Sequence, residues 1–428
     1  MAERVLVLGG GVAGLLAARR HARRGALVTV LEPGRRWGGR VSPHELAGLT
    51  LDAGAESFAT RGGIVLDVAR ELGLEADVVA PEPRPAWVVA PDAAYPLPRT
   101  GWLGIPTRPL DPEVRRVIGL GPAVAAALER SKGLDDVPDD VTVGALVRSR
   151  LGAAVADRLV APVLQGVYSR PLDDLPLAAI DPSLPAQLRD AGSLTALAER
   201  RRRLAPAGSA VLGIRGGIWR LTAALAEAAA GAGARLVPGT GADAVARVDG
   251  AWHVSAGGGT LVADTLVVAL PQPAAHALLP GLPEPPGGVD RRVALVTLVL
   301  DAPELDEAPR GTGVLAIGGV TRAKALTHAT AKWAWLREAA HGRHVVRLSY
   351  AVTPGEDVSG FALADASRLL GVPLHAGQVV ATHAVEWADA APARVADTRP
   401  EEGLELVGSA AGLTGLAAIV GAEARAEA

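Results

Sequence analysis

Two short apolar runs near the start of the chain flank a segment rich in glycine. The first run, residues 4–8, leads directly into the glycines of residues 9–14, and the second, residues 26–31, ends on the acidic Glu32. Short continuous apolar runs of this kind are typical of buried parallel strands. The residues between them predict a helix that begins in the glycines, so the pattern predicts a βαβ unit.

The pattern then changes twice. Residues 81–112 are dense in proline and glycine, which predicts extended, irregular chain. Residues 114–128 and 143–164 carry apolar side chains at helical spacing, which predicts a helical insert.

From residue 213 onward, apolar runs again alternate with glycine-rich turns. Gly216 and Gly217 precede a predicted helix at residues 221–230. Further runs predict strands at residues 234–237, 252–254, 261–270, 293–300, 313–317, 345–350 and 404–408. The last strand leads into a second glycine-rich helix start at residues 412–416, whose amides can face a bound cofactor. Two halves of one site would then lie at opposite ends of the sequence, which predicts discontinuous domains.

Each glycine of the GxGxxG motif at residues 9–14 has its own physical role. Gly9 permits the tight turn, Gly11 lets backbone amides approach a pyrophosphate, and Gly14 lets the helix pack on the strand. Glu32 can accept hydrogen bonds from a ribose. The motif in this context predicts an adenine-dinucleotide site. In the loop that follows, Arg40 can face a phosphate, and a plain surface turn is the alternative.

Composition narrows the chemistry. A chain of 428 residues with 49% hydrophobic residues exceeds a single ordinary core and predicts two or three lobes. A net charge of −3 argues against a general nucleic-acid binder, and we interpret Arg200 to Arg203 as the solvated end of a helix. The absence of cysteine excludes disulfides, thiolate metal sites, a cysteine nucleophile and a flavin tethered through sulfur. Redox chemistry must therefore come from a cofactor.

Several other features have structural explanations. His341 and His344 lie in a predicted turn without further ligands at suitable spacing, so no metal site is expected. Trp333 and Trp335 are interpreted as packing residues. Residues 5–18 look like the apolar core of a signal peptide but fit the nucleotide fold, and residues 406–422 are too short and glycine-rich for a membrane span. We expect a cytoplasmic protein with at most peripheral membrane contact.

Four separated segments resemble the FAD-dependent porphyrinogen oxidases of haem biosynthesis, in the wider flavin amine oxidase superfamily. They are residues 51–58 (LDAGAESF), 95–99 with 104–107 (YPLPR and GIPT), 143–169, and 323–333 (AKALTHATAKW). The GxGxxG motif, Glu32, the GGR of residues 38–40 and residues 408–416 are general to the superfamily. Those general features fit amine oxidases or carotenoid desaturases equally well.

The resemblance implies oxidation of coproporphyrinogen III to coproporphyrin III, with hydride passing to non-covalently bound FAD. Dioxygen is the implied terminal acceptor and hydrogen peroxide the by-product. The implied partners are a porphyrinogen and O2, and a downstream ferrochelatase, with no nucleic acid; the oligomeric state is left open. Arginine in large excess over lysine, with abundant alanine, is typical of a GC-rich, actinobacterial genome, and this favours coproporphyrinogen III over protoporphyrinogen IX.

Four alternatives stay open from the residues. They are a protoporphyrinogen IX oxidase, an amine oxidase or desaturase, a non-catalytic FAD-binding protein and, least favoured, a nicotinamide dehydrogenase. The third is suggested by departures from the family pattern at Ala55, Glu56 and residues 413–417.

The resemblance also implies the site residues. Because the flavin carries the chemistry, no side chain is assigned as an acid or base catalyst, and no metal ligand is assigned. Three basic residues are candidates for the substrate carboxylates: Arg61, Arg99 and Lys332. The residues expected to contact FAD are Gly9, Gly10, Gly11, Val12, Ala13, Gly14, Glu32, Pro33, Gly39, Arg40, Gly54, Ala55, Glu56, Ser57, Val245, Trp387, Gly408, Thr414, Gly415 and Leu416.

The expected fold class is α/β, or α+β overall, in three parts. Residues 1–55, 207–275 and 396–428 would form a Rossmann-like FAD-binding domain. Residues 56–108, 190–206 and 276–395 would form a mixed-sheet substrate-binding domain, and residues 109–189 a small helical insert.

Overall fold

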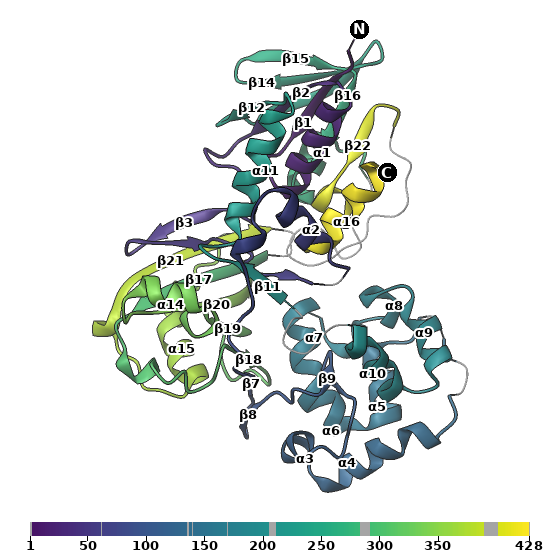
Figure 1. Cartoon of the computed structure of the whole chain (residues 1–428), viewed down its shortest axis with the longest axis vertical. Helices are drawn as coiled ribbons and strands as arrows, with labels where there is room; N and C mark the ends of the chain where they lie inside the picture. The colour runs from purple at the N-terminus through teal and green to yellow at the C-terminus, as the bar shows by residue number, and fades with distance from the viewer. Residues whose placement is uncertain are drawn as a thin grey trace.

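A parallel sheet of five strands draws its strands from both ends of the chain (Figure 1). The computed structural model describes residues 2–60, 62–134, 137–138, 140–168, 170–204, 211–282, 292–388 and 401–427. The strand order in this sheet is β12 (Arg235–Pro238), β2 (Leu27–Glu32), β1 (Arg4–Leu8), β16 (Thr265–Val268) and β22 (Leu404–Leu406). Each neighbouring pair is parallel, and the central strand is buried from Val5 to Leu8. The predicted βαβ unit is confirmed.

Alternation along β1 explains how both faces of this sheet are covered. Val5 and Val7 pack in one apolar cluster with Ala17 and Ala18 of helix α1 (Val12–Arg23). Leu6 and Leu8 pack in another cluster with Trp252 on the opposite face. Helices α11 (Trp219–Gly231) and α16 (Leu416–Glu427) both pack against α1.

An antiparallel sheet of β13 (Ala242–Val248), β14 (Ala251–Ala256) and β15 (Gly259–Ala263) contributes Trp252 to that second face. The prediction of one strand over residues 261–270 is wrong, because the run divides at Asp264 between β15 and β16. Asp264 accepts a hydrogen bond from the Arg4 amide at 2.8 Å and forms an ion pair with the Arg4 guanidinium at 2.6 Å. Asp264, paired with Arg4, lies between the last residue of β15 and the first residue of β16.

A mixed sheet of seven strands forms the second lobe, at the lower left of Figure 1. Its order is β21 (Val379–Ala388), β17 (Arg292–Leu300), β20 (His344–Val352), β19 (Ala325–His328), β18 (Gly313–Ala316), β7 (Ala86–Val89) and β8 (Ala94–Pro96). Strands β18 and β7 are parallel, and the other pairs are antiparallel. Helix α15 (Ala362–Leu370) covers one face with the apolar residues of an amphipathic helix. The proline-rich segment is therefore only partly irregular, because it supplies β7 and β8.

A body of helices forms the third lobe, at the lower right of Figure 1. The two long predicted helices are divided, because Gly119 and Gly152 adopt positive φ angles of 84° and 90°. The α-helices of this body are α3 (Pro112–Ile118), α4 (Leu120–Ala127), α5 (Val143–Leu151), α6 (Ala153–Val155), α7 (Ala161–Tyr168), α8 (Leu177–Ile180), α9 (Leu184–Ala191) and α10 (Leu194–Leu204). A hairpin of β9 (Gly101–Trp102) and β10 (Ile105–Pro106) packs on α10.

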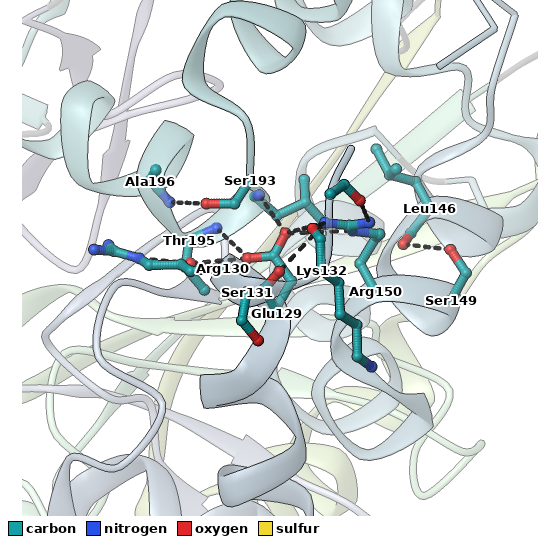
Figure 2. Close-up of polar contacts among 12 residues, drawn as sticks. Glu129, Arg130, Ser131, Lys132, Leu146, Ser149, Arg150, Ser193, Thr195 and Ala196 are labelled. Carbon is teal, nitrogen blue, oxygen red and sulfur yellow. Dashed lines mark hydrogen bonds and ion pairs between the residues drawn. The ribbon is translucent and has the colours of Figure 1, made fainter. Parts of the chain in front are cut away.

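One buried carboxylate joins two parts of this helical body (Figure 2). Glu129, in the turn after α4, is fully buried. Its side chain accepts hydrogen bonds from the Leu194 amide at 2.7 Å and the Thr195 hydroxyl at 2.9 Å, at the start of α10. The guanidinium of Arg150 on α5 lies 3.4 Å away. Glu129 thus connects α4, α5 and α10 through one charge.

The remaining described strands and α-helices are short. They are the hairpin β3 (Pro43–Leu46) and β4 (Leu49–Asp52), β5 (Phe58–Ala59), α2 (Ile64–Glu71), β6 (Val78–Val79), β11 (Val211–Ile214), α12 (Gln272–Leu278), α13 (Ala329–Lys332) and α14 (Ala334–Ala340). None of the helices in the described ranges combines the length and apolar character needed to cross a bilayer.

Charged side chains fasten the last segments of the chain to the first helix. Arg20 on α1 forms ion pairs with Glu405 on β22 and with Glu423 on α16, the latter at 3.2 Å. His21 lies 3.0 Å from the Glu405 carboxylate. The predicted meeting of the two ends of the chain is confirmed.

Candidate functional site

The glycine-rich turn after β1 combines close packing with open space. A Cβ atom on Gly14 would collide with the Gly9 carbonyl, and one on Gly9 would lie 2.7 Å from the Ala269 carbonyl oxygen. A Cβ on Gly11 would have only the Gly38 oxygen nearby, at 3.9 Å. Gly11 is also the N-cap of α1, and no side chain caps this helix end. Val12 and Ala13 follow in the first turn, so their amides lie at a helix N-terminus suited to an anion.

Glu32 is held rigidly at the end of β2. One carboxylate oxygen accepts a hydrogen bond from the Gly10 amide at 2.8 Å, and the other from the Gly34 amide at 2.7 Å. A carboxylate fixed between two amides keeps its free lone pairs in a defined direction. Pro33 follows directly and packs near Gly241.

Two further glycine segments lie against this turn. The Gly38 amide donates to the Gly10 carbonyl at 2.8 Å, and Gly39 adopts a φ of 54°. Arg40 donates to the Ala388 carbonyl at 2.5 Å, so its side chain reaches β21. The Ala55 amide donates to the Arg40 carbonyl at 3.0 Å, and a Cβ on Gly54 would collide with that carbonyl. Residues 38–40 and 54–55 therefore form one packed pair of loops.

The end of β4 and the loop that joins it to β5 carry two carboxylates that are largely shielded from solvent. Asp52 accepts hydrogen bonds from the amides of Ile218 and Trp219 at 3.1 and 3.0 Å and so caps α11 from a distant part of the chain. Burial raises the pKa of Asp52 to about 7, against the opposing effect of these amides. Glu56 lies 2.7 Å from Lys332 Nζ and 3.1 Å from Arg347. Burial alone would raise the pKa of Glu56, but these two cations outweigh it and hold the pKa below its ordinary value.

The C-terminal segment approaches the same turn. Gly408, with a φ of 59°, lies so close to α1 that a Cβ there would come within 2.6 Å of the Ala13 Cβ. Leu416 begins α16 and is buried in one cluster with Val12. Between them lie Thr414 and Gly415, and a Cβ on Gly415 would meet nothing within 4 Å. A second helix N-terminus therefore opens near the first.

The remaining predicted FAD contacts lie on two sheets. The indole of Trp387 on β21 donates to the Ala53 carbonyl at 3.2 Å, next to the Gly54 loop. Val245 on β13 packs against the cluster that contains Leu31 of β2. Ser57 lies between Glu56 and β5. The structure thus places Trp387 and Ser57 beside the loop of residues 54–56, and Val245 near the end of β2.

The three substrate candidates have different surroundings. Arg61 lies outside the described residues. Arg99 is exposed, 3.6 Å from the Glu113 carboxylate, and lines a small surface cavity with Arg116. Lys332 is largely buried and paired with Glu56. To bind a substrate carboxylate as predicted, the Lys332 ammonium group would have to contact that carboxylate and Glu56 at the same time.

Sequence reasoning missed Asp52 and Arg347. With Glu56 they line a cavity of about 30 Å³, which also contacts Trp335, whose indole nitrogen is buried without a hydrogen-bond partner among the described residues. A cavity of this size that is lined in part by charged side chains can hold a water molecule. The available signal for Arg347 was a lone cation within the apolar run of β20.

The histidines considered for a metal site are engaged elsewhere. His344 lies 3.1 Å from His328 and 3.0 Å from the Asp306 carboxylate. His341 ends α14 with a φ of 49°, in the expected turn. In the part of the chain that the structure describes, no group of three or more His, Cys, Asp or Glu residues is arranged to hold a metal ion.

The parallel sheet, the open helix N-termini and the fixed Glu32 define a dinucleotide-binding fold. The chain belongs to the family of flavin containing amine oxidoreductases, whose model matches residues 12–294. The cofactor is therefore a flavin, and the βαβ unit identifies it as FAD.

Several proteins similar to this chain are named coproporphyrinogen III oxidase. Coproporphyrinogen III oxidase of Staphylococcus aureus is 29% identical over 45% of this chain and 42% of its own length. The enzyme of the same name from Propionibacterium freudenreichii is 32% identical over 62% of this chain and 56% of its own. The chain thus spans about half the length of these two relatives. That of Mycobacterium leprae is 28% identical over 90% of this chain and 87% of its own.

Solved structures share the fold. A protein of Exiguobacterium sp. 255-15 with a provisional protoporphyrinogen oxidase name has a TM-score of 0.83 at 24% identity, over 100% of this chain and 98% of its own. Cyclohexylamine oxidase of Brevibacterium oxydans has a TM-score of 0.66 at 15% identity, over 100% and 99%. These likenesses confirm the predicted fold class.

The residues present fit FAD. The open space at Gly11 and the uncapped start of α1 suit a pyrophosphate, and the Glu32 carboxylate suits a ribose hydroxyl. The open space at Gly415 leaves the start of α16 accessible in the same way.

Proposed function

We propose that this chain oxidises coproporphyrinogen III to coproporphyrin III with bound FAD. The family supplies the flavin chemistry, and the proposal is supported by relatives named coproporphyrinogen III oxidase, one of them over 90% of the chain. FAD supplies a hydride acceptor when it is bound. Dioxygen is the proposed final acceptor, reduced to hydrogen peroxide, and the six electrons leave the macrocycle in two-electron steps.

Within this proposal the chain's residues bind and orient. The amides of Val12 and Ala13 would hold the pyrophosphate, and Glu32 would hold the ribose. Amides at the start of α16, after Thr414 and Gly415, would stabilise negative charge on the ring system, because a helix N-terminus carries partial positive charge. The other expected FAD contacts, in the loops of residues 39–40 and 54–57 and at Val245 and Trp387, belong to the same proposal.

The substrate bears propionate carboxylates, which need cationic partners. Arg61, Arg99 and Lys332 remain the proposed contacts by family resemblance. No acid or base side chain is required for hydride abstraction, so the protein's contribution is orientation and the exclusion of water.

The three-part domain division belongs to this proposal as well. It is supported by the sheets, since β1, β2, β12, β16 and β22 share one sheet and the strands of residues 86–96 and 292–388 share another. Helix α10, in the predicted substrate-binding segment of residues 190–206, packs instead in the helical body. The boundaries at residues 207 and 396 lie outside the described residues. We place the protein in the cytoplasm, with a downstream ferrochelatase as the proposed partner.

Protoporphyrinogen IX is the second candidate substrate. Protoporphyrinogen oxidase of Nicotiana tabacum is 28% identical over 43% of this chain and 36% of its own length. We rank this candidate second, because this relative is matched over a smaller share of its own length than the coproporphyrinogen III oxidases described above.

One experiment separates the candidates. FAD-loaded protein is mixed anaerobically with each porphyrinogen, or with an amine, and the visible flavin absorption is followed; oxygen is then admitted, and porphyrin fluorescence and peroxide are measured. We expect coproporphyrinogen III to bleach the flavin fastest and to yield fluorescence above the non-enzymatic control. Bleaching by the amine alone, or by no substrate, contradicts the proposal.

A further inference from the structure

Arg347 reaches from the mixed sheet to the loop that joins β4 to β5. Its side chain is only 13% exposed. One guanidinium nitrogen donates to the Gly54 carbonyl at 2.7 Å and to the Asp52 carbonyl at 3.2 Å. The other terminal nitrogen lies 3.1 Å from the Glu56 carboxylate. Asp52, Gly54 and Glu56, every second residue of this segment, therefore all contact the same guanidinium group.

This arrangement suits arginine in particular. A buried guanidinium is stable only when its donors are satisfied, and its planar fork can serve several acceptors at once. Lysine carries the same charge on one nitrogen and cannot reproduce that geometry. The Arg347 contacts fix both the backbone and the side chain of the loop.

The loop has a second side that packs on the loop of residues 38–40. Gly54 packs against the Arg40 carbonyl, and Ala55 donates to it. Trp387 donates to the Ala53 carbonyl. Any displacement of Gly54 would therefore move the backbone that the FAD contacts of residues 39–40 and 54–57 share.

We propose that Arg347 is a positioning residue for the cofactor, which holds residues 52–56 in the shape that admits FAD. The inference rests on the proposed assignment of residues 54–57 as FAD contacts. Arg347 acts through the carbonyls of Asp52 and Gly54 and takes no direct part in the reaction.

The test measures FAD affinity of the apoprotein by flavin fluorescence, which does not depend on any substrate. For Arg347→Gln we expect the dissociation constant to rise about ten-fold or more, which corresponds to about 1.4 kcal/mol. For Arg347→Lys we expect a smaller rise of several-fold. Should Arg347→Gln fail to fold, Arg347→Lys decides the matter, because unchanged FAD affinity in that variant overturns the proposal.

Arg343→Gln is the matched control. Arg343 donates to the Ala47 carbonyl at 2.9 Å, so it also clamps backbone of the β3–β4 hairpin, but away from the proposed FAD contacts. We expect its FAD affinity to stay within two-fold of the wild type. An equal loss in both arginine variants would show general destabilisation and overturn the proposal.

Wild-type protein that binds FAD but oxidises no porphyrinogen would refute the proposed function while leaving this inference standing.

Discussion

At the scale of single residues, two glycines of the turn after β1 have different roles. Gly14 is needed for close packing, whereas Gly11 leaves space for a ligand. A methyl group at position 14 would collide with the Gly9 carbonyl, whereas one at position 11 would enter open space at a favourable φ of −76°. The same chemical change therefore has different consequences only three residues apart.

We expect Gly14→Ala to destabilise the protein by about 1–3 kcal/mol or more, because α1 must move away from β1. Gly11→Ala should keep its melting temperature as apoprotein but lose at least ten-fold in FAD affinity. Gly231→Ala, at the end of α11 where a Cβ meets nothing within 4 Å, is the control for glycine replacement in general. Thermal unfolding and FAD titration of the three variants test these expectations. A Gly14→Ala protein as stable as the wild type would contradict the packing role of Gly14.

Asp52 gives a prediction in pH. Burial raises its pKa to about 7 from 3.8 in the unfolded chain, so the folded state binds the proton more tightly. Between these values the native carboxyl holds a proton that the unfolded one has lost, and stability must fall as pH rises. Relative to Asp52→Asn, the wild type should lose up to about 1.4 kcal/mol per pH unit over this range.

Urea unfolding of both proteins across the range measures this difference. Subtracting the Asp52→Asn values removes the titration of other groups. A difference that stays constant with pH would mean that Asp52 is ionised in the native protein throughout.

The role of a residue could be predicted from the sequence where its contacts lie within a few residues along the chain. The glycines at positions 9 and 14 have steric roles within a few residues, so their motif predicts their packing. Arg347 and Asp52 are 295 positions apart, and nothing in the local pattern of either residue indicates the other. From the sequence, Glu56 is predicted as an FAD contact and Lys332 as a substrate contact. Only the structure shows that the two side chains form an ion pair.

At the scale of elements, one buried charge connects three helices of the helical body. Glu129 accepts from the start of α10 and faces Arg150 on α5 (Figure 2). Removing one partner of a buried pair leaves the other charge and the amides without compensation.

We therefore expect Glu129→Ala to cost about 3–5 kcal/mol. Hydrogen exchange should show the loss first at the start of α10, because the Leu194 and Thr195 amides lose their acceptor. Glu199→Ala is the control: Glu199 pairs with Arg130 and Arg203 on the surface of the same body, and its removal should change little. Equal effects of the two variants would contradict this account.

Element boundaries show where pattern reading succeeds and where it fails. The strands of the βαβ unit lie within one residue of their predicted ends, because a buried strand is a continuous apolar run. The predicted helices over residues 114–128 and 143–164 ignored Gly119 and Gly152, whose positive φ angles break the helical path. The strand predicted over residues 261–270 failed because apolar content alone does not reveal that Asp264 pairs with Arg4.

At the scale of the whole molecule, the site is assembled from segments nearly the full chain apart. Gly408 packs on Ala13, and Arg20 pairs with Glu405 and Glu423. The meeting of these segments could be predicted, because both are glycine-rich helix starts after apolar strands. Their side-chain partners could not be predicted, because ion pairs of this kind depend on the tertiary packing.

We expect FAD to protect both segments together. Hydrogen exchange of apoprotein titrated with FAD should show slower exchange at residues 9–15 and 408–419 with the same dependence on FAD concentration. Residues 143–151 of α5 should be unaffected. Protection confined to the N-terminal segment would show that the last segments take no part in binding, and Gly11→Ala at the same FAD concentrations provides the control.

The edge position of β22 also has a consequence for synthesis. Translation produces β1 and α1 long before the segment around residue 408, so a nascent chain carries only one part of the proposed nucleotide pocket while the residues between them are made. Complete binding of the flavin must then await that later segment, and scarcity of FAD in the cell would leave chains with a formed but unfilled pocket exposed to proteolysis.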